Sequence, residues 1–446
     1  MAEFRKILIA NRGEIAIRVM RAANEMGKST VAVFAKEDKL SLHRFKADEA
    51  YEIGEALGPV ASYLNINEII SVAIRAGADA IHPGYGLLSE KPEFAKACNK
   101  AGISFIGPTA EIMEKLGNKA NARKIAEKAV VPVIPASDIL PDNPKDLIKI
   151  AKKLGFPLML KASWGGGGRG MRLINNIEDV EKNILEGKRE AENAFGNSEA
   201  FLERYIKNAR HVEVQILGDK KGNIYHLWER DCSIQRRNQK VIERAPAPYL
   251  KDNQRQVVCE MATKICEHVG YECAGTVEFL MDIDTEEFFF IEVNPRIQVE
   301  HTITEEVTGI DIVRAQIMLS EGANLNEAIG KKNQSDIVCN GHAIQCRITT
   351  EDPLNNFIPD YGRITAYRGA TGMGIRLDGG TAYSGAIITR FYDSLLEKVT
   401  AWAPTPKDAI SRMDRALREF RIRGVSTNIS FVENLLKHKK FKENKY

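Results

Sequence analysis

The chain has 446 residues, of which 44% are hydrophobic, and 63 Lys and Arg side chains nearly balance 60 Asp and Glu side chains for a net charge of +3. This length exceeds the roughly 250–300 residues at which a single hydrophobic core stops growing, so we expect two or three domains. No apolar run approaches the ~18 residues of a membrane span, and no long basic stripe alternates with aromatic residues, so neither a membrane nor a nucleic acid is expected as a partner.

The N-terminus, MAEFRKILIANRGE, carries a short apolar patch that polar residues interrupt. It has neither the longer apolar core of a signal peptide nor the Arg- and Ser-rich character of a transit peptide. We therefore expect the mature chain to begin here and the protein to be cytoplasmic.

The first 110 residues alternate short apolar runs with helical stretches. Residues 14–26 predict a helix that ends at Gly27, and the predicted strands are KILIA (6–10), TVAVFA (30–35), ADAIHPG (78–84) and SFIGP (104–108). This alternation predicts a parallel sheet with helices on both faces. A nicotinamide-dependent enzyme would share the pattern, but the first turn, ANRGEIA, has one glycine where the dinucleotide fingerprint requires G-x-G-x-x-G.

A run of glycines follows within KASWGGGGRGMR, residues 161–172. Strand-like residues at 157–163 and 171–174 flank it, so we predict the tip of a β-hairpin. A P-loop would need Lys and then Ser or Thr after Gly170, where Met171 and Arg172 stand. The bare backbone suits a polyphosphate or a mobile lid, and the alternative is a flexible hairpin that binds nothing.

Two further hairpins are predicted, from 211–219 to 224–231 and from 275–283 to 287–294. Symmetry about position 285 in the second hairpin places Glu278 opposite Glu292 on the neighbouring strand. Like charges at directly opposed positions are destabilising. A divalent cation between the two carboxylates would make the arrangement favourable.

Polar and apolar residues alternate through 292–300. The polar positions are Glu292, Asn294, Arg296, Gln298 and Glu300. Acid and amide oxygens suit a hard cation, while arginine, glutamine and a further glutamate suit a small oxyanion and its proton. The alternative is a solvated strand face, for which Pro295 would suit an edge strand.

The last hundred residues predict mixed α+β structure, with strand-like runs at 341–348, 362–368 and 395–402 and a helix at 406–420. Arg347 shares its parity with Ala343 and Gln345, so composition alone favours an exposed arginine over a catalytic one. The basic tail KHKKFKENKY, residues 437–446, is expected to be a solvated end or the beginning of a linker.

The seven cysteines are an odd number without a C-x-x-C motif, which indicates reduced thiols. Cys259 and Cys266 are seven residues apart, so they would share one face of a helix. We expect them to pack in the core rather than to bind zinc.

Several long stretches together resemble the biotin carboxylase family, whose catalytic core is an ATP-grasp fold. They are ANRGEIAIR, IHPGYGLLSE, KASWGGGGRGMR, RHVEVQ, ERDCSIQRRNQKVIERAPAP, IEVNPRIQVEHTITE and GHAIQCRI. The resemblance covers essentially the whole chain. RRNQK, CRITTEDP and IPDYGRITAYRGATG are more similar to the biotin carboxylase region of pyruvate carboxylases than to stand-alone subunits. Those subunits usually carry histidine at the position of Asn238, so a nucleotide contact by imidazole is not carried over.

The resemblance implies an ATP site with Mg²⁺ or Mn²⁺. Phosphates and ribose would be held by Lys119, Lys161, Gly165, Gly166, Gly167, Gly168 and His211. The adenine-side hinge would be Glu203, Arg204, Tyr205 and Ile206. Gln235, Glu278 and Glu292 complete the implied ATP site. The metal would be ligated by Glu278, Glu292 and Asn294.

The resemblance also implies sites for bicarbonate and biotin. Bicarbonate would be held by Arg296, Gln298, the Val299 backbone and Lys240. Glu300 would take its proton, and Arg347 would stabilise the enolate of the biotin ureido oxygen, with Tyr85 also at the biotin site. The implied catalytic residues are Glu300, Arg296, Arg347 and Lys240.

The implied fold is α/β, or α+β overall. It comprises a Rossmann-like N-terminal domain at 1–118, an ATP-grasp domain at 119–325 with a mobile lid at about 137–205, and a mixed α+β C-terminal domain at 335–446. The sequence has no Met-Lys-Met acceptor for biotin, so biotin would arrive on a carrier domain, with a carboxyltransferase domain as a further partner. A homodimer, or a tetramer in a full-length enzyme, is expected.

The implied activity is carboxylation of biotin through carboxyphosphate, the first half-reaction of a pyruvate carboxylase. The alternative within the family is a stand-alone subunit of acetyl-CoA or another acyl-CoA carboxylase. Outside it, the alternatives are an ATP-grasp ligase for another carboxylate and a catalytically idle domain that binds ATP.

Overall fold

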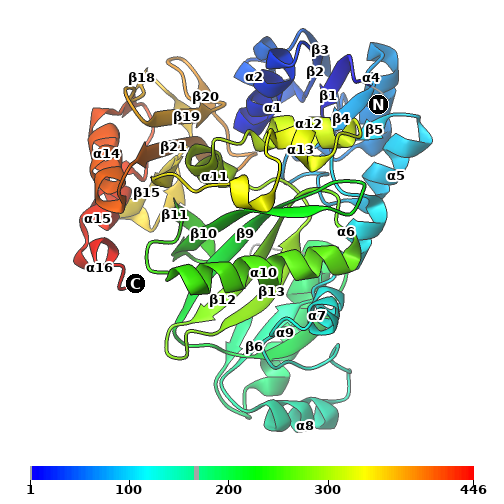
Figure 1. The fold of residues 1–446 in the computed structure, drawn as a ribbon, viewed down its shortest axis with the longest axis vertical. Coiled ribbons are helices and arrows are strands. Elements are labelled where there is room, and N and C mark those ends of the chain that lie inside the picture. The colour runs from blue at the N-terminus through cyan, green and yellow to red at the C-terminus, as the bar shows by residue number, and fades with distance from the viewer. Residues whose placement is uncertain (1–2, 165–169) are drawn as a thin grey trace.

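The computed structural model describes residues 3–164 and 170–446 (Figure 1). The glycines at 165–168, which were expected to contact phosphate, lie outside the described residues. Most strands in the described part belong to sheets of five, eight and three strands. We call these the N-terminal, the central and the small sheet.

The N-terminal sheet is parallel, with the order β3-β2-β1-β4-β5, which confirms the prediction. Its strands are β1 (Lys6–Ile9), β2 (Ser29–Phe34), β3 (Glu49–Glu52), β4 (Ala80–His82) and β5 (Ser104–Phe105). Its helices are α1 (Gly13–Glu25), α2 (Leu42–Lys46), α3 (Pro59–Tyr63), α4 (Ile66–Ala76) and α5 (Pro92–Lys100). Ile7 and Ile9 enter the core formed with α1, whereas Leu8 enters the core formed with α4 and α5. Because side chains of a strand alternate, helices cover both faces.

The small sheet lies at the opposite end of the molecule in Figure 1. It is reached through α6 (Ala110–Gly117) and α7 (Lys119–Lys128), and its elements are α8 (Pro144–Leu154), β6 (Leu158–Ala162), β7 (Arg172–Ile174), α9 (Val180–Phe195) and β8 (Ala200–Arg204). β6 pairs antiparallel with β7 and β8. The strands on either side of the glycine run are therefore paired, as predicted.

The central sheet is antiparallel, in the order β13-β12-β9-β10-β11-β14-β21-β19. Its strands are β9 (Ala209–Gly218), β10 (Ile224–Arg236), β11 (Gln239–Ala245), β12 (Cys273–Asp282), β13 (Phe288–Asn294), β14 (His342–Thr349), β19 (Ile375–Gly379) and β21 (Leu395–Ala403). Both predicted hairpins, β9–β10 and β12–β13, are present. The pairing of β11 with β14 makes the sheet continuous between the ATP-grasp and C-terminal parts expected from the sequence.

The two faces of the central sheet differ in character. α10 (Asp252–Val269) covers one face, where Val212 and Val214 pack with Val258 (Figure 1). α11 (His301–Thr308) lies against the other face, and Thr304 Oγ1 there accepts a hydrogen bond from Arg230 at 3.0 Å. The alternation that buries the valines under α10 therefore directs the polar residues between them toward α11.

The remaining elements follow α11, and all of them except α12 and α13 belong to the C-terminal part, whereas α12 and α13 share a core with α1. These remaining elements are α12 (Ile312–Ser320), α13 (Leu325–Ile329), β15 (Glu351–Asp352), β16 (Ile358–Pro359), β17 (Gly362–Arg363), β18 (Ala366–Arg368), β20 (Ile387–Ile388), α14 (Pro406–Glu419), β22 (Arg421–Arg423), α15 (Ile429–Lys437) and α16 (Lys439–Lys442). α14 packs on β21 and β14, and its buried residues share a core with theirs. The predicted helix at 406–420 is confirmed.

The basic tail is folded, which corrects the expectation of a solvated end. Phe441 is 2% exposed, and its ring stacks on Tyr446 with 5.5 Å between centroids. The Asn444 carbonyl accepts a hydrogen bond from Arg210 at 2.5 Å, and the Tyr446 hydroxyl donates to Asp231 at 2.5 Å. The aromatic residues of this segment are packed against the rest of the protein, while its lysines point outward. The high positive charge of the segment therefore did not indicate that it is folded.

Cys259 and Cys266 lie in α10 and are buried in the core beneath it, which confirms the predicted helix face. Each of the seven cysteines has a free thiol. Over the ranges that the structure describes, no helix combines the length and the apolar character needed to cross a membrane.

Packing of the tail can be tested by Phe441→Ala. Removing a buried phenylalanine ring is expected to cost about 3 kcal/mol or more of the free energy of unfolding. The matched control is Phe45→Ala, because the side chain of Phe45 lies at a surface and is 60% exposed. Chemical denaturation of both variants checks the expectation. Equal small losses would mean that the tail is not part of the core.

Candidate active site

Three glutamates lie in one row across the central sheet. The register places Glu213 of β9 opposite Glu278 of β12, and Glu278 opposite Glu292 of β13. The second pairing is the one predicted from the symmetry of the hairpin. Glu213 and Glu278 are also buried. Because opposed like charges repel, this glutamate row requires cations beside it.

Lys240 of β11 is the cation at the centre of the site. Its Nζ lies 2.6 Å from Glu213 Oε2, 3.0 Å from Glu278 Oε1 and 2.6 Å from Glu300 Oε1. Burial alone would lower the pKa of Lys240, but these carboxylates raise it well above its ordinary value. Lys240 is therefore charged at neutral pH and joins Glu300 to the glutamate row.

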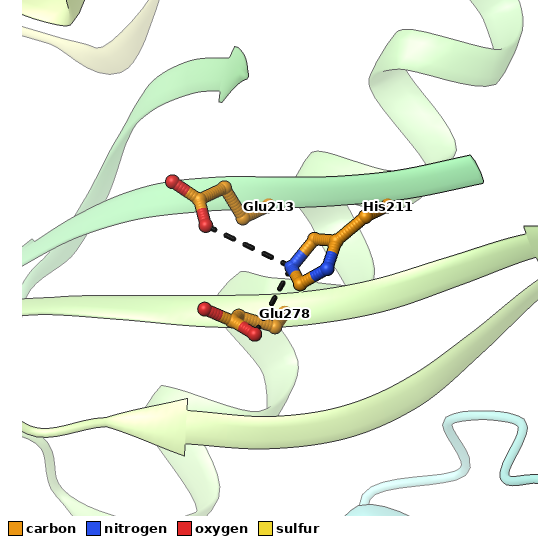
Figure 2. Close-up of side chains that lie close together, drawn as sticks. All are labelled: His211, Glu213 and Glu278. Atoms are coloured by element: carbon orange, nitrogen blue, oxygen red, sulfur yellow. Dashed lines mark ion pairs between the residues drawn. The ribbon is translucent and has the colours of Figure 1, made fainter. Parts of the chain in front are cut away.

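His211 adds a second basic side chain beside the row. Its Nε2 lies 3.0 Å from Glu278 Oε2 and 3.9 Å from Glu213 Oε2 (Figure 2). Burial alone would lower the pKa of His211, but Glu278 more than offsets this and raises it. Gln235 Nε2 lies 3.1 Å from the other ring nitrogen, so two residues implied for ATP binding lie together.

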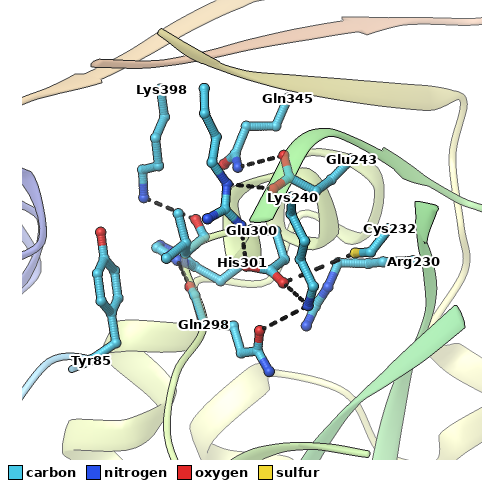
Figure 3. A network of polar contacts seen from close by, with 12 residues as sticks. Tyr85, Arg230, Cys232, Lys240, Glu243, Gln298, Glu300, His301, Gln345 and Lys398 are labelled. Atoms are coloured by element: carbon cyan, nitrogen blue, oxygen red, sulfur yellow. Dashed lines mark hydrogen bonds and ion pairs between the residues drawn. The ribbon is translucent and has the colours of Figure 1, made fainter. Parts of the chain in front are cut away.

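Glu300 immediately precedes α11 and is almost completely buried. Lys240 contacts one of its carboxylate oxygens (Figure 3). Arg347 Nη2 lies 3.1 Å from the other oxygen. Burial alone would raise the pKa of Glu300, but Lys240 and Arg347 hold it well below its ordinary range. The carboxylate is therefore ionised at neutral pH.

Arg347 corrects the expectation of an exposed side chain. Only 20% of its side chain is exposed, and its Nε donates to Glu243 Oε1 at 2.6 Å. Its parity neighbours Ala343 and Gln345 are buried as well. β14 lies inside the sheet with α11 against this face, so the strand has no solvated side. The alternation of residues within one strand does not indicate which of its faces a helix covers.

The alternating segment 292–300 is a strand only at its start. β13 ends at Asn294, directly before Pro295, and an irregular turn leads from there into α11. The prediction that 292–300 forms one continuous strand face is therefore wrong beyond Asn294. The polar side chains still converge, because Asn294 Nδ2 and Gln298 Nε2 both donate to Glu278 Oε1, at 3.0 and 3.2 Å.

The solvated-face alternative is wrong as well, because Asn294, Gln298 and Glu300 are 7%, 4% and 1% exposed. Arg296 is held at the edge of the cluster, with Nη2 donating to Asn294 Oδ1 at 3.1 Å and Nε lying 3.1 Å from Glu90 Oε2. The implied bicarbonate residues thus form one connected group.

The implied phosphate and adenine residues lie toward the small sheet. Lys119 Nζ lies 2.9 Å from Glu292 Oε2, at the end of the glutamate row, and the Lys119 N–H donates to the Ser163 carbonyl at 2.9 Å. Lys161 and Glu203 form an ion pair between β6 and β8. The rest of the implied hinge, Arg204, Tyr205 and Ile206, lies at and beyond the end of β8 and is exposed or half-buried.

The residues implied for the metal fit a hard cation. Glu278, Glu292 and Asn294 present two carboxylates and an amide oxygen, which are the donors that Mg²⁺ and Mn²⁺ prefer. A second cluster, Glu213, Cys232 and Glu300, does not fit as well. Burial and then Glu213 raise the pKa of the Cys232 thiol well above its ordinary value, so the sulfur keeps its proton.

Sequence reasoning missed several residues of this site, above all Arg230, Glu213 and Glu243. Arg230 is fully buried, and its Nε donates to Glu213 Oε1 at 2.6 Å while Nη1 donates to Gln215 Oε1 at 2.7 Å. The signal was present in the sequence. Symmetry of the 211–231 hairpin about its turn places Arg230 opposite Glu213, as the register does.

Removal of Arg230 tests its part in balancing the glutamate row. Arg230→Met would leave Glu213 buried with one cation fewer, so we expect a loss of about 3–5 kcal/mol in the free energy of unfolding. Arg418→Met is the control, because Arg418 is 59% exposed and pairs with Asp414 at the surface. That change should cost less than about 1 kcal/mol. Similar midpoints for both variants in urea would contradict the role.

Three family models match successive parts of the chain. They are the biotin carboxylase N-terminal domain at 3–113, the ATP-binding domain of the carbamoyl-phosphate synthase L chain at 118–328, and the biotin carboxylase C-terminal domain at 345–446. The first model covers the N-terminal sheet, the second covers the small sheet and strands β9 to β13 of the central sheet, and the third covers the central strands from β14 onward.

Similar proteins include much longer enzymes. Pyruvate carboxylase of Staphylococcus aureus is 55% identical over 448 residues, a match that covers 100% of this chain and 39% of that protein. A structure of Rhizobium etli pyruvate carboxylase matches with a TM-score of 0.97 and 63% identity, over 100% of this chain and 40% of that one. The chain thus spans about 40% of the length of these relatives.

A third match has nearly the same length as this chain. It is the biotin carboxylase domain of 2-oxoglutarate carboxylase from Hydrogenobacter thermophilus, crystallised as a dimer in complex with MgADP, ADP and bicarbonate. The TM-score is 0.96 and the identity 44%, over 100% of this chain and 96% of that one. The three sheets, the row of opposed glutamates and these matches lead to one conclusion: the chain belongs to the biotin carboxylase family of ligases, with an ATP-grasp fold at its centre.

Proposed function

We propose that the chain uses ATP and bicarbonate to carboxylate biotin carried on a separate domain, through carboxyphosphate. The observation that supports this most directly is the setting of Glu300, an ionised and buried carboxylate with Lys240 on one side and Arg347 on the other. A base flanked by cations can both attract an anionic substrate and accept its proton.

In the proposed first step, bicarbonate is bound by Arg296, Gln298, the Val299 N–H and Lys240. Lys240 and Arg347 stabilise the charge of Glu300, lower its pKa and make it a weak base. When Lys240 turns toward bicarbonate, Glu300 becomes more basic and takes its proton. The bicarbonate oxygen then attacks the γ-phosphorus of ATP, the bond to the ADP oxygen breaks, and carboxyphosphate forms.

We place ATP between the glutamate row and the small sheet. The proposed ligands are Lys119, Lys161, Gly165, Gly166, Gly167, Gly168, Glu203, Arg204, Tyr205, Ile206, His211, Gln235, Glu278 and Glu292. Glu278, Glu292 and Asn294 would hold Mg²⁺ or Mn²⁺, which when bound neutralises charge on the transferring phosphoryl group. Lys119 and His211 already lie against Glu292 and Glu278, so both can move from carboxylate to phosphate without crossing the site.

In the second step, carboxyphosphate breaks down to CO₂ and phosphate. The phosphate takes the proton of the biotin ureido nitrogen, which then attacks CO₂. Negative charge develops on the ureido oxygen, and Arg347 is the proposed cation that stabilises it. Tyr85 forms another wall of the biotin site, and its hydroxyl is held by Glu14.

The proposal extends to the longer enzyme of which this chain would be a part. Identity with pyruvate carboxylases over the entire chain supports the first half-reaction of that enzyme, with a biotin carrier domain and a carboxyltransferase domain as partners. A cytoplasmic location is part of the proposal, although relatives of similar identity include mitochondrial enzymes. The dimeric relative supports a homodimer, and a full-length enzyme could assemble further into a tetramer. We propose functional units at 1–118, 119–325 with a lid at about 137–205, and 335–446. A stand-alone subunit of an acyl-CoA carboxylase is the alternative.

The decisive assay measures ATP cleavage with Mg²⁺ and bicarbonate, with and without free biotin, while carboxybiotin is trapped. Biotin should accelerate cleavage, and carboxybiotin should form in step with ADP. If biotin has no effect, the assay is repeated with a biotinylated carrier domain. Cleavage that neither form of biotin accelerates would reject the proposed function in favour of a ligase for another carboxylate.

Glu300→Gln tests the proposed base. The amide keeps the size of the side chain but cannot accept the bicarbonate proton, so bicarbonate-dependent cleavage of ATP should fall by roughly 10²- to 10⁴-fold. Calorimetry should give nearly the wild-type affinity for MgATP, which serves as the control for folding. Turnover close to that of the wild type would rule out Glu300 as the base.

Arg347→Ala tests the separation of the two steps. Loss of the cation that stabilises the enolate should slow carboxybiotin formation by about 100-fold or more. Bicarbonate-dependent ATP cleavage measured without biotin should fall much less, because Lys240 still orients Glu300. An equal loss in both assays would count against a role in carboxyl transfer.

A further inference from the structure

Lys398 of β21 is a charged side chain that the proposed reaction does not use. It is completely buried, and its Nζ lies 3.0 Å from Glu14 Oε2 and donates to the Val299 carbonyl at 3.0 Å. A buried ammonium group costs several kcal/mol unless it is paired and hydrogen-bonded. The two contacts meet that need, and one of them reaches the backbone of the proposed bicarbonate site.

Glu14 connects Lys398 to the proposed biotin site. It lies in the first turn of α1 and is buried. Its Oε1 accepts a hydrogen bond from the Tyr85 hydroxyl, and Lys398 Nζ lies 5.8 Å from the centre of the Tyr85 ring. Figure 3 shows Tyr85 and Lys398 on one side of the polar network, with Arg230 and Cys232 on the other. The three residues come from the N-terminal and C-terminal parts of the fold.

The Val299 carbonyl belongs to the peptide group that joins Val299 to Glu300. The orientation of this group therefore sets the backbone from which the Glu300 side chain projects. Residues 295–300 form no strand or helix, so no ladder of backbone hydrogen bonds holds the group in place. Lys398 supplies a charge-assisted hydrogen bond from outside the segment, and such a bond is stronger than a neutral one.

We propose that Lys398 is a positioning residue for Glu300, and that Glu14 acts through it by fixing the lysine ammonium and the Tyr85 hydroxyl together. This inference rests on the proposed role of Glu300 as the base. The inference gives α1 of the N-terminal part a role in the chemistry, because Glu14 of α1 forms the ion pair with Lys398.

Lys28 provides a matched control. It is also a buried lysine, and its Nζ lies 2.5 Å from the Glu321 carboxylate and donates to the Phe4 carbonyl at 2.9 Å. The chemistry of its contacts is the same as at Lys398, but its partners are not residues of the proposed site. Lys398→Met and Lys28→Met should therefore lower the unfolding midpoint to a similar extent while differing in function.

The kinetic test compares bicarbonate-dependent ATP cleavage by the two variants in the 446-residue chain. A displaced base should lower kcat for Lys398→Met by about 10- to 100-fold, because small errors in placement of a reacting group have effects of this size. The KM for MgATP should stay within about twofold of the wild-type value. Lys28→Met should leave both quantities near wild type. Equal kcat values for the two variants at saturating bicarbonate would overturn the proposal.

A second readout does not depend on turnover. Amide hydrogen exchange in the segment 299–303 should be faster in Lys398→Met than in the wild type, and unchanged in Lys28→Met. Unchanged exchange in Lys398→Met would overturn the positioning role. If the wild-type chain cleaves no ATP, the proposed function fails, and hydrogen exchange still decides whether Lys398 holds this segment.

The part of Glu14 is tested by a double-mutant cycle with Glu14→Gln and Lys398→Met. Residues that act as one unit have non-additive effects, so the double variant should be no slower than Lys398→Met alone. Multiplied losses in kcat would show that Glu14 acts independently of Lys398 and would overturn its assigned role.

Discussion

The structure depends on a row of carboxylates that cannot exist without cations beside it. Glu213, Glu278 and Glu292 occupy opposed positions on three neighbouring strands, and the first two are buried. Burial opposes the ionisation of Glu213 and Glu278, and the repulsion between opposed carboxylates must also be balanced. Lys240 contacts two of the three, and Lys119 pairs with Glu292. Every strand of this part of the sheet therefore contributes either a charge or its partner.

This balance also suits the site to its proposed substrates. In the structure, Lys119, His211 and Lys240 all have carboxylate partners. ATP and bicarbonate are anions that can take over these cations, and a divalent cation can take over the carboxylates. The exchange keeps the buried charges paired throughout, so the desolvation cost of an unpaired ion is avoided. The proposed reaction thus uses the same electrostatic constraint that the fold must satisfy.

The continuity of the central sheet explains how distant segments meet at Glu300. β11 brings Lys240 and Glu243, β14 brings Arg347, and β21 brings Lys398. A rigid sheet can hold such groups within a few tenths of an ångström, which separate domains joined by a linker could not do as easily. Glu14 adds the N-terminal sheet to the same assembly through Lys398. The proposed active site accordingly brings together residues from all three parts of the chain.

Local pattern was sufficient wherever a feature depends on residues close together in sequence. The alternation of the first 110 residues predicted the parallel sheet, and hairpin symmetry predicted the opposition of Glu278 and Glu292. The symmetry of the 211–231 hairpin also indicates that Glu213 pairs with Arg230, but this pairing was not predicted. The resemblance to a known family added residues, such as Tyr85 and Arg347, whose place no local pattern indicated.

Other features were decided only by the tertiary structure. Burial of Arg347 requires α11 on one face of β14. Docking of the tail requires Arg210 and Asp231, which lie on strands some two hundred residues away in the sequence. Lys398 contacts Val299 and Glu14 only in the folded chain. The sequence determined which residues alternate and which could pair across a short turn. The tertiary structure decided which of those faces is covered and which charged groups meet. Both depend on contacts between segments that are far apart in the sequence, and a local sequence pattern carries no information about such contacts.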